Sequence, residues 1–480
     1  MQKETKEQPL RAVVAAVHLM SVSDIEFDAS LTELRELAKT LGYTVVGTFI
    51  QKRAKFDSAA YLGIGKRQEM RRFVEGENAG EEASESEEDA ERNDDAKVTS
   101  RGPARNGIAK AKAAAQSEAD PVTRRADIIL VDHEISPSQA RNLEIEVGCE
   151  VMDRTMVILE IFHRHASSRA ARAQVEIARL GYMSPRLREA AKLAGPKGRQ
   201  RSGTGGRGAG ETHAALDRQK IRNRIAELEV ELAAMDVERQ TQRARRQAGQ
   251  ALARVALVGY TNAGKSTLMR ALTGSEVLVA NKLFATLDTT VRALFPESVP
   301  RVLVSDTVGF IKNLPHDLVA SFKSTLEEAA ESSLLLHVID ASDPGFPRQL
   351  AVTDKVLDEI GAGAVPRIRV FNKIDMVGDA TLQAECDAAL REQYPDCIVM
   401  SAKRESDVAK LHAAILAFFQ RGLVEAELFL PWSAQQLRGK IFASCEVLDE
   451  RADNDGAFLR VRGEADTVKA LREQLGAKRA

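Results

Sequence analysis

The segment that most constrains the fold is a glycine-framed loop that directly follows the apolar run RVALVG at residues 254–259. Gly259, Gly264, Lys265 and Ser266 complete the pattern Gly-x-x-x-x-Gly-Lys-Ser, and a helical run comes next. Such glycines let the loop turn its backbone N–H groups toward phosphates, and the helix N-terminus adds partial positive charge. The strand, loop and helix therefore predict a parallel α/β sheet with a nucleotide-phosphate site at the end of this strand.

Two residues of this loop are predicted to carry specific chemistry. We expect Lys265 to reach the β- and γ-phosphates and to be catalytic, and we expect the Ser266 hydroxyl to bind Mg²⁺. The other loop residues expected to line the phosphates are Tyr260, Thr261, Asn262, Ala263 and Thr267.

A second motif, VLVSDTVG at residues 302–309, places an acidic residue at the end of an apolar run. Asp306 is expected to orient the hydration shell of Mg²⁺, and the Gly309 amide is expected to sense the γ-phosphate and act in catalysis. Thr307 and Val308 complete the segment predicted to lie at the nucleotide.

A third motif, Asn372-Lys373-Ile374-Asp375, follows the apolar run RIRVFN. A carboxylate at Asp375 can accept from N1–H and the 2-amino group of guanine, whereas adenine lacks both donors and would leave the buried acid unpaired. After a last apolar run, CIVM, the residues expected to approach guanine O6 through their backbone are Ser401, Ala402 and Lys403. Four motifs in this order, each after an apolar strand, predict a GTPase.

The segment LFATLDTT precedes Asp306 and is where a switch loop must offer a threonine hydroxyl to Mg²⁺. Thr286, Thr289 and Thr290 all qualify, and spacing alone does not choose among them. Phe310 stands where Ras-type GTPases carry the glutamine that orients the attacking water. Because phenylalanine has no donor or acceptor, we expect slow intrinsic hydrolysis, with the water oriented by another residue or by a partner.

Upstream, residues 11–160 alternate apolar runs with helical segments, which predicts a mostly parallel sheet. An insertion interrupts this unit at about 75–121, and eleven of the twenty-one residues from Glu75 to Asp95 are acidic. Such a composition buries too little apolar surface to fold, so we expect the insertion to be disordered. A passive solvated loop and a regulatory segment are both compatible with it.

Residues 156–250 change to helical periodicity. The spacing predicts one helix over 156–183 and another over 214–246, joined by a Gly/Arg-rich loop at 195–210, and hence a helical hairpin. The whole chain carries 68 basic and 70 acidic residues, but residues 154–250 hold twenty basic residues against ten acidic ones. This local excess predicts RNA binding through the hairpin, with solvated helix faces as the alternative.

Several classes of protein are disfavoured by composition. No apolar run approaches the roughly 18 residues that span a bilayer, and the first ten residues lack the features of a secretory signal. The four cysteines are scattered without a Cys-x-x-Cys pair, which favours neither a disulfide framework nor a zinc site. We therefore expect a cytoplasmic protein.

The motifs together resemble those of the HflX family of GTPases. GYTNAGKST, LFATLDTT, DTVGFI and NKID are similar to the family's motifs almost letter for letter. Upstream, YLGIGKRQEM, SPSQARNLE, DRTMVILEIF and GRGAGET are similar to family segments as well. The resemblance covers nearly all of the chain. It implies an α/β N-terminal domain with a long helical hairpin, a Ras-like P-loop GTPase domain and a small α/β C-terminal domain.

On this basis we expect parts at residues 1–155, 156–250, 251–421 and 422–480. The resemblance further implies GTP hydrolysis stimulated by the large ribosomal subunit, binding to that subunit and its RNA, and splitting of stalled ribosomes under stress. We expect a monomer that is partly ribosome-associated. The resemblance assigns Thr286 as the switch threonine on Mg²⁺. The neighbours that it puts at the nucleotide are Phe284, Ala285, Leu287 and Asp288.

The chain departs from the family pattern in its long insertion and at Ala209, where the family's loop carries proline and where alanine should loosen the loop. Two other functions stay open. One is a GTP-regulated scaffold that binds proteins through the hairpin. The other is an RNA-remodelling factor that uses ATP in the N-terminal domain, where Gly63, Gly65 and Lys66 could touch phosphate.

Overall fold

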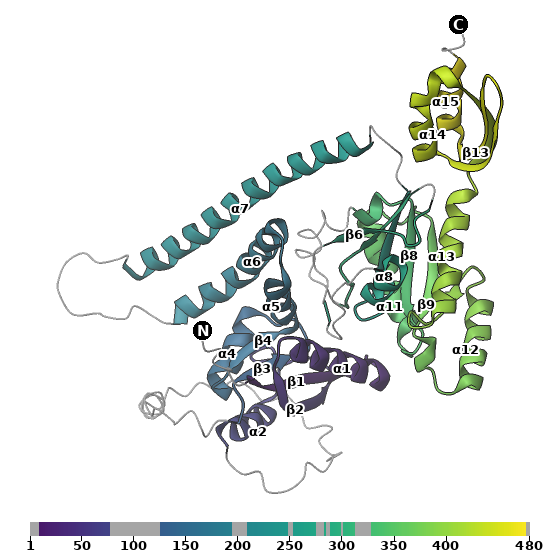
Figure 1. Ribbon diagram of the computed structural model, residues 1–480. Coiled ribbons are helices and arrows are strands. Elements are labelled where there is room, and N and C mark those ends of the chain that lie inside the picture. The colour runs from purple at the N-terminus through teal and green to yellow at the C-terminus, as the bar shows by residue number, and fades with distance from the viewer. Residues whose placement is uncertain are drawn as a thin grey trace, which may run out of the picture. The chain divides into compact units, whose positions relative to one another are not determined.

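The structure is a computed structural model and is shown in Figure 1. It describes residues 9–76, 125–193, 209–247, 253–274, 283–284, 289–298, 301–312 and 328–476. The chain divides into two compact units, Met1–Arg154 and Thr155–Ala480, and each is considered by itself. The insertion predicted at about 75–121 lies outside the described residues, apart from its first two.

The first unit is built on a four-stranded sheet of order β2-β1-β3-β4, in which all three pairings are parallel. Its strands are β1 (Arg11–Leu19), β2 (Thr44–Arg53), β3 (Ile128–Val131) and β4 (Glu150–Asp153). The described helices of this unit are α1 (Asp24–Thr40), α2 (Ile64–Glu75) and α4 (Pro137–Val147). Buried aliphatic side chains of β1, β3 and β4 form the core, so the α/β unit expected from the apolar runs is confirmed.

Local sequence signals set the ends of helix α4. Its start is a capping box, because the Gln139 N–H donates to Ser136 Oγ at 3.2 Å and the Ser136 N–H donates to Gln139 Oε1 at 3.0 Å. Pro137 occupies the first turn, where its missing N–H costs nothing. The helix ends at Gly148, whose φ of +83° favours glycine.

The second unit begins with helices, and here one prediction is wrong. The single helix predicted over 156–183 is two helices, α5 (Arg154–His165) and α6 (Arg169–Leu193). The break has a local cause, because Ser168 Oγ accepts the Ala171 N–H at 3.1 Å and so caps a new helix. The apolar spacing continues through the break and conceals it.

The long helix α7 (Ala209–Gln247) packs against α6, as expected for a hairpin (Figure 1). Leu228 of α7 is buried, and ion pairs join the two helices. Arg224 of α7 donates to Glu176 of α6 at 2.9 Å, and Arg169 of α6 pairs with Glu231 of α7. Most of the Gly/Arg-rich loop predicted at 195–210, namely residues 195–208, lies outside the described residues.

A six-stranded sheet of order β10-β9-β8-β5-β7-β6 follows. The strands are β5 (Ala253–Gly259), β6 (Thr290–Ala293), β7 (Val302–Asp306), β8 (Leu334–Asp340), β9 (Arg367–Asn372) and β10 (Ile398–Val399). Every pairing is parallel except β6 with β7. The described helices around it are α8 (Lys265–Thr273), α11 (Phe346–Glu359), η1 (Ile374–Met376), α12 (Ala380–Gln393) and α13 (Glu405–Gln420). Two apolar cores pack on this sheet, and the nucleotide motifs follow the carboxyl ends of its parallel strands.

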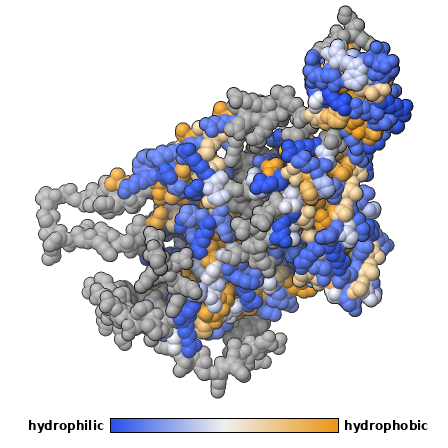
Figure 2. All heavy atoms as spheres, viewed as in Figure 1, coloured by the Kyte–Doolittle hydropathy of each residue, from blue (hydrophilic) through white to orange (hydrophobic). Residues whose placement is uncertain are grey.

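The last part is an antiparallel sheet of order β11-β13-β12, with a core of leucine and valine side chains. Its elements are β11 (Leu423–Pro431), η2 (Trp432–Leu437), α14 (Arg438–Ser444), β12 (Glu446–Ala452), β13 (Gly456–Glu464) and α15 (Ala465–Gly476). The expected strands with a closing helix are present, and α14 is an addition to that expectation. Figure 2 shows mainly hydrophilic residues over this part in the view drawn. Among the described residues, no helix combines the length and apolar character that a membrane crossing needs.

Candidate nucleotide-binding site

The glycine-framed loop has the strand–loop–helix context that its sequence predicts. Strand β5 ends at Gly259 and helix α8 begins at Lys265. Gly264 lies between them with a φ of +96°, and a Cβ there would lie 2.3 Å from Nδ2 of Asn372. Only glycine fits this position, because any side chain would be strained and would also collide with the neighbouring motif.

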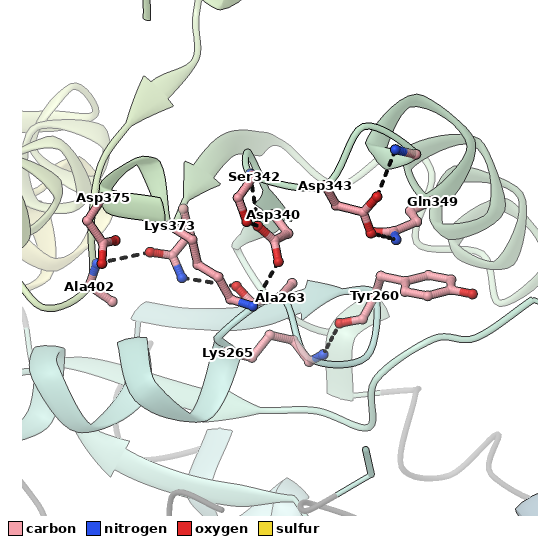
Figure 3. Close-up of polar contacts among 12 residues, drawn as sticks. Tyr260, Ala263, Lys265, Asp340, Ser342, Asp343, Gln349, Lys373, Asp375 and Ala402 are labelled. Carbon is pink, nitrogen blue, oxygen red and sulfur yellow. Dashed lines mark hydrogen bonds and ion pairs between the residues drawn. The ribbon is translucent and has the colours of Figure 1, made fainter. Parts of the chain in front are cut away.

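Lys265 is held inside this loop. Its Nζ donates to the backbone oxygen of Gly259 at 3.0 Å and to that of Tyr260 at 2.8 Å, and Figure 3 shows the contact with Tyr260. Burial lowers the pKa of Lys265 to about 8, against the opposing effect of the Asp306 carboxylate. An ammonium group that is desolvated in this way gains strongly from a phosphate brought close to it.

Ser266 and Asp306 bring a hydroxyl and a carboxylate together beside the loop. Ser266 Oγ donates to Asp306 Oδ2 at 2.7 Å, and Asp306 is fully buried at the end of β7. Thr307 Oγ1 donates to the backbone oxygen of Leu257 at 2.7 Å, which ties the segment after β7 to β5. Hydroxyl and carboxylate oxygens are ligands that Mg²⁺ prefers, so these residues fit that ion.

The segment at Gly309 lies directly against the glycine-framed loop. Phe310 donates its N–H to Gly259 O at 3.1 Å and accepts the Thr261 N–H at 2.7 Å. A Cβ at Gly309 would lie 2.9 Å from Lys265 Nζ and 3.0 Å from Thr261, so the close approach needs glycine. The Phe310 side chain is 2% exposed and packed inside the fold.

Asn372 links the two halves of the site. At the end of β9, it donates from Nδ2 to Ala263 O at 2.9 Å and accepts the Ala402 N–H on Oδ1 at 2.9 Å. One side chain therefore connects the glycine-framed loop with the loop at 401–403.

The Asp375 carboxylate is oriented by two hydrogen bonds and kept in its ionised form. Its Oδ1 accepts from Ser401 Oγ at 2.7 Å, and its Oδ2 accepts from Lys403 Nζ at 3.2 Å. Burial by itself would raise the pKa of Asp375, but the Ser401 hydrogen bond and the Lys403 ammonium outweigh it and hold the pKa below its usual value. The carboxylate is therefore ionised at neutral pH, the state that accepts from guanine donors.

Two supporting acidic residues, Asp340 and Asp407, were missed by sequence reasoning. Asp340 accepts from Lys373 Nζ at 2.7 Å and from the backbone and hydroxyl of Ser342 (Figure 3). Asp407, in the first turn of α13, accepts the Ser401 N–H at 3.1 Å. A signal for Asp340 existed, because it ends an apolar run as Asp306 does.

Part of the predicted switch lies outside the described residues, namely Ala285, Thr286, Leu287 and Asp288. Phe284 is described, with a φ of +56°, and is buried. Its ring lies edge-on against Phe162 of α5, with centroids 4.6 Å apart. Thr290, another candidate switch threonine, begins strand β6.

The remaining predicted site residues have the following settings. Asn262 is exposed with a φ of +59°, and Thr267 is half-buried in α8. Val308 and Ile374 are buried. In the first unit, the Gly63 N–H donates to Gln51 and Lys66 pairs with Glu69 at 2.9 Å.

Comparison with known proteins yields matches along most of the chain. Three family profiles match: "GTP-binding GTPase N-terminal" over residues 28–81 and 99–163, "GTP-binding GTPase Middle Region" over 165–246, and "50S ribosome-binding GTPase" over 254–373. A solved GTP-binding protein from the archaeon Sulfolobus solfataricus in complex with GDP is 21% identical, covers 84% of this chain and 99% of its own, and has a TM-score of 0.40.

The relatives found by sequence share a higher identity with this chain than that solved structure does. The GTPase HflX of Gluconacetobacter diazotrophicus is 50% identical over 99% of this chain and 100% of its own length. The GTPase HflX of Caldanaerobacter subterraneus subsp. tengcongensis is 41% identical over 96% of this chain and 93% of its own. With this identity over the full length and a complete GTPase motif set, the chain belongs to the HflX family of GTPases, which hydrolyse GTP.

Proposed function

We propose that the chain binds the large ribosomal subunit in its GTP-bound state, hydrolyses GTP there, and so splits or rescues stalled ribosomes under stress. The observation that carries the proposal is the match of residues 254–373 to the profile described as a 50S ribosome-binding GTPase. Membership of the HflX family over nearly the full chain supports it.

In this proposal the phosphates of GTP lie in the loop between β5 and α8. Lys265 binds the β- and γ-phosphates, and the Gly309 amide donates to the γ-phosphate. Asp375 accepts from the guanine edge, and the backbone at 401–403 meets O6. The contacts among these segments support the assignment, since Asn372 bonds both the glycine-framed loop and the 401–403 loop.

Mg²⁺ would be held by Ser266 and Thr286, with Asp306 behind its hydration shell. The Ser266 hydroxyl and the Asp306 carboxylate, 2.7 Å apart, are the hard oxygen donors that this ion takes. When bound, the ion would neutralise charge that develops on the phosphates. The hydroxyl of Thr286 would join it only while the γ-phosphate is present, which would make the switch nucleotide-dependent.

Phe310 supports slow hydrolysis by the free protein. Its side chain has no hydrogen-bonding group and is buried, while its backbone is bonded to the glycine-framed loop. In the proposal, therefore, another group orients the attacking water, and docking on the subunit brings that group into position. The catalytic contribution of the chain itself comes from Lys265, Thr286 and Gly309.

The RNA contact in this proposal belongs to the loop at 195–210. Some basic residues of 154–250 pair within the hairpin, because Arg224 pairs with Glu176 and Arg169 with Glu231, but each pair also uses an acidic residue and leaves the basic excess unchanged. The sequence of the loop carries arginines without any acidic residue, and in this proposal these arginines contact RNA phosphates.

Co-sedimentation with purified large subunits tests the proposal. We expect association with a non-hydrolysable GTP analogue, weaker association with GDP, and loss as salt is raised from about 50 to 200 mM, because RNA binding releases counterions. Association that ignores both nucleotide and salt would contradict it.

A variant of the hairpin loop distinguishes the RNA contact from the alternative of a scaffold that binds proteins. Replacing Arg199, Arg201 and Arg207 together by alanine removes loop charge but leaves the GTPase motifs intact. Loss of subunit binding supports the RNA contact. Unchanged subunit binding contradicts it and favours docking through protein contacts.

A further inference from the structure

We propose that Asp340 is a positioning residue for guanine, which it serves by holding the Lys373 side chain as one wall of the base site. Asp340 ends strand β8 and Lys373 directly follows strand β9. The two strands are paired in parallel with Asp340 opposite Asn372, so both residues leave the sheet at one edge. Lys373 Nζ donates to Asp340 Oδ2 at 2.7 Å.

The Asp340 carboxylate is also held in place by Ser342, independently of Lys373. Its other oxygen, Oδ1, accepts from the Ser342 N–H at 3.0 Å and from the Ser342 hydroxyl at 2.6 Å. Two donors on one oxygen set the rotamer of Asp340 and leave Oδ2 turned toward the lysine. The Asp340 side chain is 15% exposed and that of Lys373 is 23% exposed, so solvent screens the pair only partly.

Lys373 is thereby anchored at both ends. Its backbone sits in a tight turn with a φ of +64°, and its ammonium is held on the neighbouring strand. Figure 3 shows the side chain running from the Asp375 side of the site toward Asp340. The aliphatic stem is stretched between these points, and an apolar stem of this kind can cover the face of a planar base.

Asp375 and Asp340 serve different parts of the base, Asp375 directly and Asp340 through Lys373. Asp375 accepts hydrogen bonds at the guanine edge, whereas the stem of Lys373 lies against the ring face. Without the Asp340 anchor the lysine would return to many rotamers, and binding would have to order it again. The effect falls on the base and not on the phosphates, so GDP and GTP should be affected equally. This inference needs GTP binding only, and it stands or falls independently of the ribosomal proposal.

The test is Asp340→Asn, which keeps the acceptor for Ser342 but removes the charge that holds Lys373. We expect the dissociation constants for GDP and GTP to rise by the same factor, roughly ten-fold, as for loss of one charge-assisted hydrogen bond. Turnover at saturating GTP should stay unchanged. The matched control is Asp354→Asn, which breaks the 2.6 Å pair with Arg367 elsewhere on this part of the chain and should leave nucleotide affinity unchanged.

A double-mutant cycle separates positioning from general structure. In a Lys373→Ala background, Asp340→Asn should add less than about two-fold, because its effect passes through the lysine. Full additivity would overturn the proposal, as would unchanged affinity in Asp340→Asn or a loss confined to GTP. If Asp340→Asn does not fold, Ser342→Ala decides the matter. It should raise both dissociation constants by a smaller common factor, and unchanged constants would contradict the proposal.

Discussion

At the scale of single residues, His337 shows how burial sets protonation in the GTPase part of the chain. It lies in β8 and is 1% exposed, with Nδ1 3.7 Å from Oδ1 of Asp354. That carboxylate is already engaged by Arg367 at 2.6 Å. Burial, reinforced by the positive charges of Arg367 and Arg369, therefore lowers the pKa of His337 to about 3. The imidazole is neutral in the folded state throughout the physiological range.

This histidine predicts a pH-dependent stability. Below pH 6.5 the unfolded chain binds a proton that folded His337 does not, so the free energy of unfolding falls as the pH drops toward 3. The loss by pH 5 is about 2 kcal/mol for this one group. Urea unfolding at pH 7 and pH 5 should show a smaller difference in His337→Gln than in the parent. The surface substitution His163→Gln is the control. Equal differences in the parent and His337→Gln would contradict the assignment.

Asp375 leads to a prediction about base selectivity. Replacing Asp375 by asparagine removes the ionised acceptor and presents an amide donor, which suits the 2-oxo group of xanthine. We expect affinity for GDP to fall by about 100-fold, as for two lost hydrogen bonds to a charged group, and affinity for xanthosine diphosphate to rise. Competition between these two nucleotides measures both effects. Retained preference for GDP would show that Asp375 does not contact the base.

The site residues predicted from the sequence are those whose chemistry lies in the motif itself. Asp306 ends an apolar strand and Asp375 follows one, and their expected partners, the hydration shell of Mg²⁺ and the guanine base, favour an acidic residue at each position. Asp340 also ends an apolar run, but its role and that of Asp407 could not be assigned from the sequence, because their partners are protein groups. The role of Asp340 depends on the pairing of β8 with β9, and an acid in the first turn of a helix, like Asp407, is ordinary helix chemistry.

At the scale of elements, periodicity predicted which segments are helical but not where one helix ends. Residues 156–183 keep their apolar spacing across the break between α5 and α6. The break depends on a cap, and the sequence does carry the signal, since Ser167 and Ser168 interrupt the run. Burial of an apolar face continues on both sides, so the hydrophobic pattern alone favours a single helix.

The cap itself can be measured. Ser168→Ala removes the acceptor of the Ala171 N–H and should destabilise the start of α6 by about 1 kcal/mol. Ser168→Asp keeps an acceptor and should retain most of that stability. Amide hydrogen exchange at Ala171 reports the difference directly. Equal protection in the two variants would mean that the side chain does not cap the helix.

At the scale of the whole molecule, the balance of 68 basic and 70 acidic residues conceals two opposed blocks. We propose the division of the chain into 1–155, 156–250, 251–421 and 422–480.

The acidic block, residues 75–95, begins at the end of helix α2, because Glu75 is the last residue of that helix and Gly76 is its C-cap. The residues from 77 to 95 can therefore be removed without cutting a described helix.

That deletion tests whether the acidic block opposes RNA binding. Removing residues 77–95 should strengthen association with RNA or ribosomes at low salt, and the gain should shrink as salt is raised, because screening weakens interactions between charges. Filter binding at two salt concentrations measures it. Unchanged association at both concentrations would leave the insertion a passive loop.

The most direct test of the central claim is the rate of GTP hydrolysis with and without purified large ribosomal subunits. A chain with buried Phe310 at the water-orienting position should turn over slowly alone. The subunits should stimulate it by at least about ten-fold, in a saturable manner, as a partner that completes a GTPase site does. Lys265→Ala should abolish both rates. A rate that is already fast alone and unaltered by the subunits would contradict the account.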